Sequence, residues 1–233
     1  MKRRADKSFV VLLDSRSRQD GTTTHAPTFH LTQALCGVSH VRVKSVQFAN
    51  TLYNMRQGHN QIALTNGVVG IIPPAYYTPS ELVDTINGLA IGIALTYTGS
   101  VLQWDTGVNV LDVSNTTARE TLEIQIGQLY TGVFQTRLFL ASPMNADFVC
   151  AQLQTSYYSY SGRGRDSNVQ PLISVPVLSG HGSMSFFLPV NLTPLDTGGM
   201  SFNQLNFQVL DSWTGDPLTE IGPWSMQIEC YLK

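Results

Sequence analysis

The chain has 233 residues, a formal net charge of −2 and a sequence pI near 6.2. This near-neutral charge excludes a global basic field of the kind that draws proteins to the phosphate backbone of nucleic acids. Charged residues make up only 13% of the chain, against roughly 25% in a typical soluble domain. Because obligate interfaces are depleted in charge, we expect much of the surface to be buried against neighbouring subunits.

The one cluster of positive charge lies at the start of the chain, at Lys2, Arg3, Arg4 and Lys7. The apolar run that follows stops at Asp14 and is too short for a secretory signal. No stretch approaches the roughly 20 apolar residues of a membrane span. We therefore interpret residues 1–8 as a basic arm, followed by a domain over residues 9–233 that is expected to have one core.

Short runs of β-branched and aromatic residues with period-two alternation follow, separated by Gly, Pro, Asn and Ser. In chain order, they predict strands at residues 9–13, 40–48, 61–64, 68–72, 93–97, 101–104, 108–113, 122–126, 148–153, 172–177, 183–188, 205–210 and 225–232. The apolar positions change phase at Ser45, which indicates a bulge or an edge. So many short strands favour a sandwich, a jelly roll or a barrel.

One segment departs from the strand pattern. Thr78 and Glu81 flank Pro79 in a capping box, with Thr78 as N-cap and Pro79 in the first helical position. The apolar residues after it fall on one helical stripe, at Leu82, Val83, Ile86, Leu89 and Ala90. This predicts a short amphipathic helix at about residues 79–91, and Gly88 and Gly92 indicate that it ends early.

Residues 156–167 are the best candidate for a long exposed loop. The residues that we expect to be exposed there are Tyr160, Gly162, Arg163, Gly164, Arg165 and Asp166. This run nearly spells the Arg-Gly-Asp adhesion tripeptide, but Arg165 interrupts it. It also lacks the preceding strand and the following helix that phosphate binding requires, so a surface loop is the better interpretation.

The chain contains no catalytic motif of the nucleophile-elbow, P-loop or dinucleotide type, and its 16 acidic residues are scattered, mostly at turns. The five histidines form no HxH or HExxH pair. Three widely spaced cysteines are not a disulfide framework and are interpreted as buried free thiols: Cys36, Cys150 and Cys230. We therefore predict no catalytic residue, no metal site and no cofactor. The four-residue spacing of Cys36 and His40 could suit a pair of metal ligands, but the entry to a strand with a buried thiol explains it better.

Several segments, taken in order, carry a family resemblance. They are the first strand with residues 13–18, then residues 29–31, 41–46 and 50–54, residues 72–78 before the helix, and residues 207–211 and 215–217 before a last strand containing Glu229. Together they resemble the single jelly-roll penton, or minor capsid, proteins of double-stranded DNA viruses in the adenovirus and giant-virus lineage, including virophages and polinton-like viruses. The central part of the chain is less distinctive.

The resemblance implies an all-β fold, an antiparallel β-sandwich with a single jelly roll and the one short helix. It also implies a structural protein without enzymatic activity or a small-molecule substrate. Such proteins form homopentamers at the fivefold vertices of icosahedral capsids and contact trimers of the major capsid protein. The expected location is the virion, assembled in the host cytoplasm or nucleus. The basic arm is hypothesised to face the shell interior and to touch other minor capsid proteins, an internal membrane or DNA.

Two other functions stay open at the level of sequence. Trp104, Trp213 and Trp224, with nine tyrosines, would serve as sugar-stacking platforms in a carbohydrate-binding β-sandwich module, although core or interface packing is favoured. A jelly-roll enzyme would require histidines and acidic residues that converge at one end of the barrel.

Overall fold

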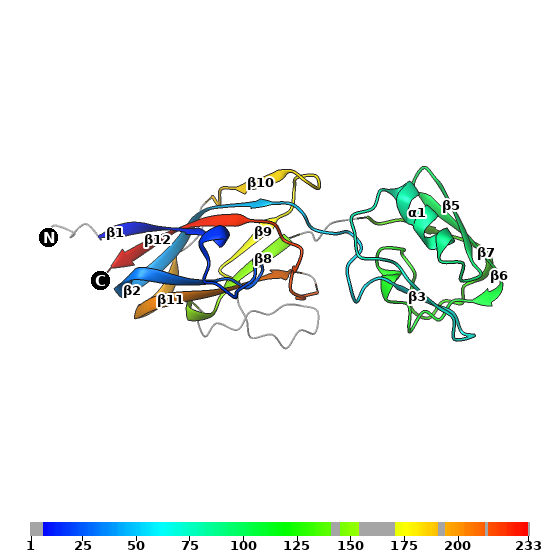
Figure 1. Cartoon of the computed structure of the whole chain (residues 1–233), viewed down its shortest axis with the longest axis horizontal. Coiled ribbons are helices and arrows are strands. Elements are labelled where there is room, and N and C mark those ends of the chain that lie inside the picture. The colour runs from blue at the N-terminus through cyan, green and yellow to red at the C-terminus, as the bar shows by residue number, and fades with distance from the viewer. Residues whose placement is uncertain (1–6, 141–144, 154–170, 191–193, 213, 233) are drawn as a thin grey trace. The chain divides into compact units, whose positions relative to one another are not determined.

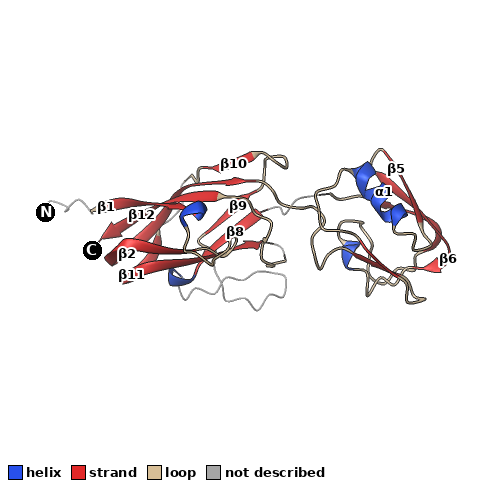
Figure 2. Ribbon diagram, viewed as in Figure 1, coloured by secondary structure: helices blue, strands red, loops and turns tan. Residues whose placement is uncertain are grey.

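The two ends of the chain pair to form one set of strands, and the residues between them form another (Figures 1 and 2). The computed structural model describes residues 7–140, 145–153, 171–190, 194–212 and 214–232. The chain divides into unit 1, residues 1–52 and 143–233, and unit 2, residues 53–142. Unit 2 is thus an insertion in the sequence of unit 1.

The strands of unit 1 form one curled antiparallel sheet. They are β1 (Ser8–Asp14), β2 (Thr28–Ala49), β8 (Asn145–Cys150), β9 (Ile173–Pro176), β10 (Met184–Phe187), β11 (Leu195–Asp211) and β12 (Trp224–Leu232). Their order is β1-β12-β2-β11-β8-β9, and β10 also pairs with β2. Unit 2 is inserted between β2 and β8.

The long strand β2 turns the corner between two layers. Its second half pairs with β12 through residues 38–48 and with β10 through residues 46–49, whereas its first half pairs with β11. The register with β11 shifts repeatedly between His30 and His40, where Gly37 has a φ of +67°. Strands that change layers do so at bends of this kind. The layers are therefore β1-β12-β2-β10 and β2-β11-β8-β9, the arrangement of a jelly roll.

The core of unit 1 lies between these layers. Along β12, every second side chain is buried in it: Trp224, Met226, Ile228 and Cys230. The Trp224 ring is surrounded by aromatic side chains of the other layer, with ring centroids 5.7 Å from Phe29, 5.2 Å from Phe148 and 5.6 Å from Phe207. Edge-to-face contacts of this kind join the layers.

Unit 2 has a separate core. It contains the pair β3 (Gln61–Ala63) and β4 (Val69–Ile71), the helix α1 (Pro79–Gly88), and the sheet β5 (Ala94–Thr98), β6 (Val101–Val110) and β7 (Thr131–Arg137). Three residues of α1 are buried in this core: Leu82, Val83 and Ile86. On the sheet, fully buried Trp104 stacks on Phe134 at 5.5 Å, and its Nε1 donates to Thr136 Oγ1 at 2.9 Å.

The helix and the bulge predicted from the sequence are both confirmed. Thr78 N donates to Glu81 Oε2 at 2.8 Å and Glu81 N donates to Thr78 Oγ1 at 3.4 Å, which completes the capping box. The helix ends early, at Gly88. At the phase change, Gln227 pairs with Ser45 and Ile228 pairs with Val43, so that Lys44 is the extra residue of a bulge.

Three sequence expectations need correction. Residues 122–126 form a turn rather than a strand, because Leu122 N and Ile124 N donate back to carbonyls of residues 118 and 119. The strands predicted at 101–104 and 108–113 are largely one strand, β6. The single core expected over residues 9–233 is two cores, since alternation shows that a side chain is buried but not which partners bury it.

No helix in the described part of the chain is long and apolar enough to span a membrane.

Candidate assembly surface

The outward face of the layer β1-β12-β2-β10 carries a compact charged cluster at its centre. Glu229 of β12 lies opposite Arg42 of β2, and Arg42 Nη2 donates to Glu229 Oε2 at 2.6 Å. The same carboxylate oxygen accepts from the Tyr231 hydroxyl at 2.8 Å and lies 3.8 Å from Lys44 Nζ. The charges and hydrogen-bonding groups of these side chains are thus paired with one another on the surface of the sheet.

Electrostatics agree with this geometry. Hydrogen bonds from the Tyr231 hydroxyl and from Arg42 stabilise the ionised carboxylate and lower the pKa of Glu229. The pKa of Tyr231 is raised because its hydroxyl donates a hydrogen bond to that carboxylate, which favours the protonated phenol. The cluster is therefore a hydrogen-bonded ion pair with a second cation nearby, which is suited to keeping the face ordered rather than to proton transfer.

The two edges of this layer differ from its centre in being apolar. On the edge strand β1, Val10 and Leu12 point outward and are exposed. On β10, at the other edge, Met184 and Phe186 do the same. Neither strand carries a charge before Asp14, whereas exposed edges are normally protected by charges, proline or bulges.

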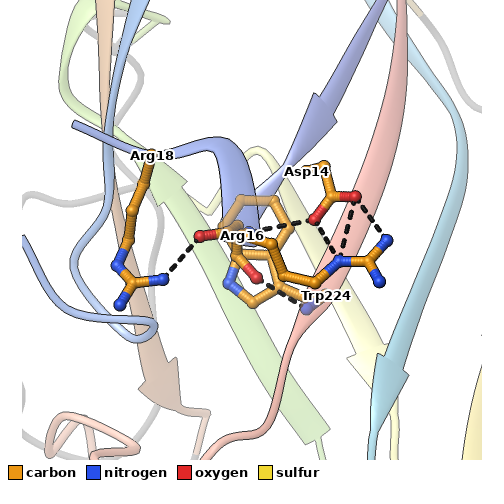
Figure 3. Close-up of polar contacts among 5 residues, drawn as sticks. Asp14, Arg16, Arg18 and Trp224 are labelled. Atoms are coloured by element: carbon orange, nitrogen blue, oxygen red, sulfur yellow. Dashed lines mark hydrogen bonds and ion pairs between the residues drawn. The ribbon is translucent and has the colours of Figure 1, made fainter. Parts of the chain in front are cut away.

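The segment that follows β1 is held in place by hydrogen bonds and an ion pair (Figure 3). Asp14 accepts from the Arg16 backbone N–H at 2.9 Å. It also forms a bidentate salt bridge with the Arg16 guanidinium, in which Nε donates to Oδ1 at 3.0 Å and Nη2 donates to Oδ2 at 2.6 Å. Arg18 donates to the carbonyl of Ser15 at 2.8 Å and to that of Thr22 at 2.7 Å. The hydrogen bonds from Arg16 lower the pKa of Asp14.

Ser15 and Trp224 form the buried contacts of this segment. Ser15 Oγ accepts from the backbone N–H of Trp224 at 2.8 Å, and Trp224 Nε1 donates to the Thr24 carbonyl at 2.8 Å. The motif at residues 13–18 therefore has a structural role. It holds the end of β1 and the start of β12 together over the central tryptophan.

The candidate site residues from the sequence lie mostly outside the described residues. This holds for Lys2, Arg3 and Arg4 of the basic arm and for every loop candidate: Tyr160, Gly162, Arg163, Gly164, Arg165 and Asp166. Lys7 is described and exposed, and its carbonyl accepts from Leu232 N at 2.9 Å. The hypotheses about the arm and the loop therefore stay predictions.

The cysteines include one correction. Cys36 is exposed rather than buried, because it lies on the irregular stretch of β2 just before Gly37. Cys150 and Cys230 are buried thiols in no disulfide, as predicted, and desolvation raises their pKa values to about 12 and about 11. Such thiols are unreactive.

Metal and sugar binding find little support in the described residues. Within that part of the chain, no group of three His, Cys, Asp or Glu side chains is placed to hold a metal ion. Trp104 and Trp224 are buried in the two cores and offer no face to a sugar. Trp213 lies outside the described residues.

Sequence reasoning missed the two apolar edges. A run such as Met-Ser-Phe-Phe at residues 184–187 carries apolar residues on both faces, and such a run is typical of a strand buried on both sides. Only the pairing of strands shows that β1 and β10 are edges. The available signal was the absence of charge within both runs.

No protein-family model matches the chain, and no curated protein matches it. Among solved structures, the chain is similar to the crystal structure of the SeMet-labelled mavirus penton protein, with a TM-score of 0.51 and 10% identity, over 96% of this chain and 99% of that chain. The Sputnik virophage cryo-electron microscopy structure aligns over 98% of both chains with 11% identity and a TM-score of 0.48. The mavirus likeness shows a shared fold along nearly the whole chain, which supports the jelly-roll prediction.

Proposed function

We propose that this chain is a penton, a minor capsid protein that forms homopentamers at the fivefold vertices of an icosahedral virion. The observation that carries the proposal is the likeness to the mavirus penton protein, which spans both units and leaves almost none of either chain unmatched. The sequence motifs in the first ninety or so residues and in the last thirty resemble the same class of protein.

The surface chemistry supports a subunit of an assembly. Charged residues make up 13% of the chain, and the outward face of one layer has uncovered apolar edges. An isolated soluble protein with such edges would tend to aggregate, whereas a subunit buries them against neighbours. A closed ring of copies covers all such surfaces with heterologous contacts.

The proposed partners outside the pentamer are trimers of the major capsid protein around the vertex. The basic arm, residues 1–8, would extend toward the shell interior, where its cations would meet other minor capsid proteins, an internal membrane or packaged DNA. Deletion of residues 1–8 tests this part separately: unchanged assembly and vertex occupancy would refute a role for the arm.

A non-enzymatic role fits the described titratable groups. Those with shifted pKa values belong to structural hydrogen bonds, such as the Asp14–Arg16 pair and the Glu229 cluster, or to buried thiols.

Native mass spectrometry of the full chain over a range of concentrations tests the proposal. We expect a five-copy species, followed by binding of that species to trimers of a co-expressed major capsid protein. A chain that stays monomeric at every concentration and does not bind the trimers would refute the vertex role. Binding of the monomer to a glycan array would instead favour the carbohydrate-binding alternative.

A further inference from the structure

We propose that the β10 edge of one copy packs against the β1 edge of the next copy, and that this contact closes the ring. The inference rests on the proposed function, because it assigns the interface of the same assembly. It starts from the two apolar edges of the layer β1-β12-β2-β10.

The first surface, called here the β10 patch, is formed by β10 and its flanking segments. Its residues are between 58% and 86% exposed: Leu178, Met184, Phe186, Leu188 and Val190. A hydrogen bond between the Ser179 and Ser185 hydroxyls holds the segment of Leu178 beside β10. Only one edge of β10 is paired among the described residues, with β2.

The second surface, called here the β1 patch, consists of Val10 and Leu12, which are 54% and 66% exposed. It lies on the same face of the layer, and β12 and β2 separate it from β10. Three strand spacings place the patches roughly 14 Å apart across the sheet. The charged cluster lies beside the β1 patch, since Glu229 is opposite Val10 on one side and opposite Arg42 on the other.

The exposed area of the two patches matches what a stable interface needs. At roughly 190 Å² for a fully exposed large apolar residue, the exposed fractions correspond to roughly 900 Å². A standard interface buries roughly 1,600 Å², of which a little over half is apolar. The patches therefore supply the apolar part of one standard interface, and polar neighbours supply the remainder.

Symmetry selects a contact between different patches. In a five-membered ring, each copy meets its two neighbours through two different surfaces, because self-complementary contacts join copies only in pairs. A β10-to-β10 contact would also leave the β1 patch exposed. Packing of the β10 patch on the β1 patch covers both and leaves the charged cluster at the rim, where charge is tolerated.

Two single variants and their mixture test the contact in the full chain. Phe186→Glu removes the β10 patch and Leu12→Glu removes the β1 patch, whereas Ile126→Glu, at an exposed apolar residue of unit 2, is the matched control. Because a charge buried in an apolar contact is costly, each single variant is expected to weaken assembly at least ~100-fold in native mass spectrometry. The control is expected to assemble like the unaltered chain.

The mixture is the decisive measurement. A Phe186→Glu chain retains the β1 patch and a Leu12→Glu chain retains the β10 patch, so the mixture is expected to form a heterodimer and nothing larger. Met184→Lys and Val10→Glu repeat the test if either first variant is misfolded by circular dichroism. Pentamers in both single variants, or loss of assembly in the Phe186→Glu variant alone, would overturn this interface and leave the penton proposal standing. An unaltered chain that never assembles would overturn the penton proposal itself.

Discussion

Replacement of Ser15 by alanine is expected to destabilise unit 1 out of proportion to the single atom removed. The Ser15 side chain is fully buried, and its Oγ accepts the backbone N–H of Trp224 at 2.8 Å. Alanine fits the site but leaves that N–H buried without an acceptor. A buried unsatisfied donor costs about 1–3 kcal/mol, a large part of the roughly 5–15 kcal/mol that stabilises a typical domain.

Urea denaturation followed by circular dichroism measures this effect. With a slope of roughly 1–3 kcal/mol per molar urea, a loss of about 2 kcal/mol moves the midpoint down by roughly 1 M. Ser17→Ala is the matched control, because Ser15–Ser17 form one 3-10 helix and Ser17, unlike Ser15, is exposed. Its expected effect is within about 0.5 kcal/mol. Equal midpoints for the two variants would refute the view that the Ser15 hydroxyl ties β1 to β12.

Three further predictions follow from the described contacts. Thr78→Ala removes the N-cap of α1 and is expected to cost unit 2 about 1 kcal/mol by thermal denaturation, with no loss in unit 1. Because the pKa of Glu229 is lowered in the folded chain, its contribution to stability is complete above its ordinary pKa of 4.5 and is lost as the pH falls through the pKa of the folded state. The Glu229→Gln variant is therefore expected to lose less stability than the unaltered chain as the pH is lowered. An unchanged dependence of stability on acidic pH would contradict the role of the Tyr231 and Arg42 hydrogen bonds. Alkylation of the native chain with iodoacetamide is expected to label Cys36 alone, whereas urea-unfolded chain takes up three labels; native labelling of the other two thiols would contradict their burial.

Local structure was predictable from the residues alone wherever one short stretch contains the whole cause. The capping box at Thr78 and Glu81 needs only neighbouring residues, and so the helix was predicted with its early end. The change of phase at Ser45 likewise revealed the bulge opposite Gln227, because alternation along one strand is enough to record it.

Which strands lie at an edge, and which side chains share a core, could be seen only in the folded chain. Phe186 and Val46 are both apolar strand residues, but Phe186 is exposed on an edge strand and Val46 is buried in the core. Pairing between strands far apart in the sequence makes that difference, and alternation carries no record of it. The same limit hid the insertion, since Trp104 and Trp224 read alike as large buried residues and yet pack in two separate cores. Whether an apolar strand residue is buried, and by which partners, is set by pairing between distant segments.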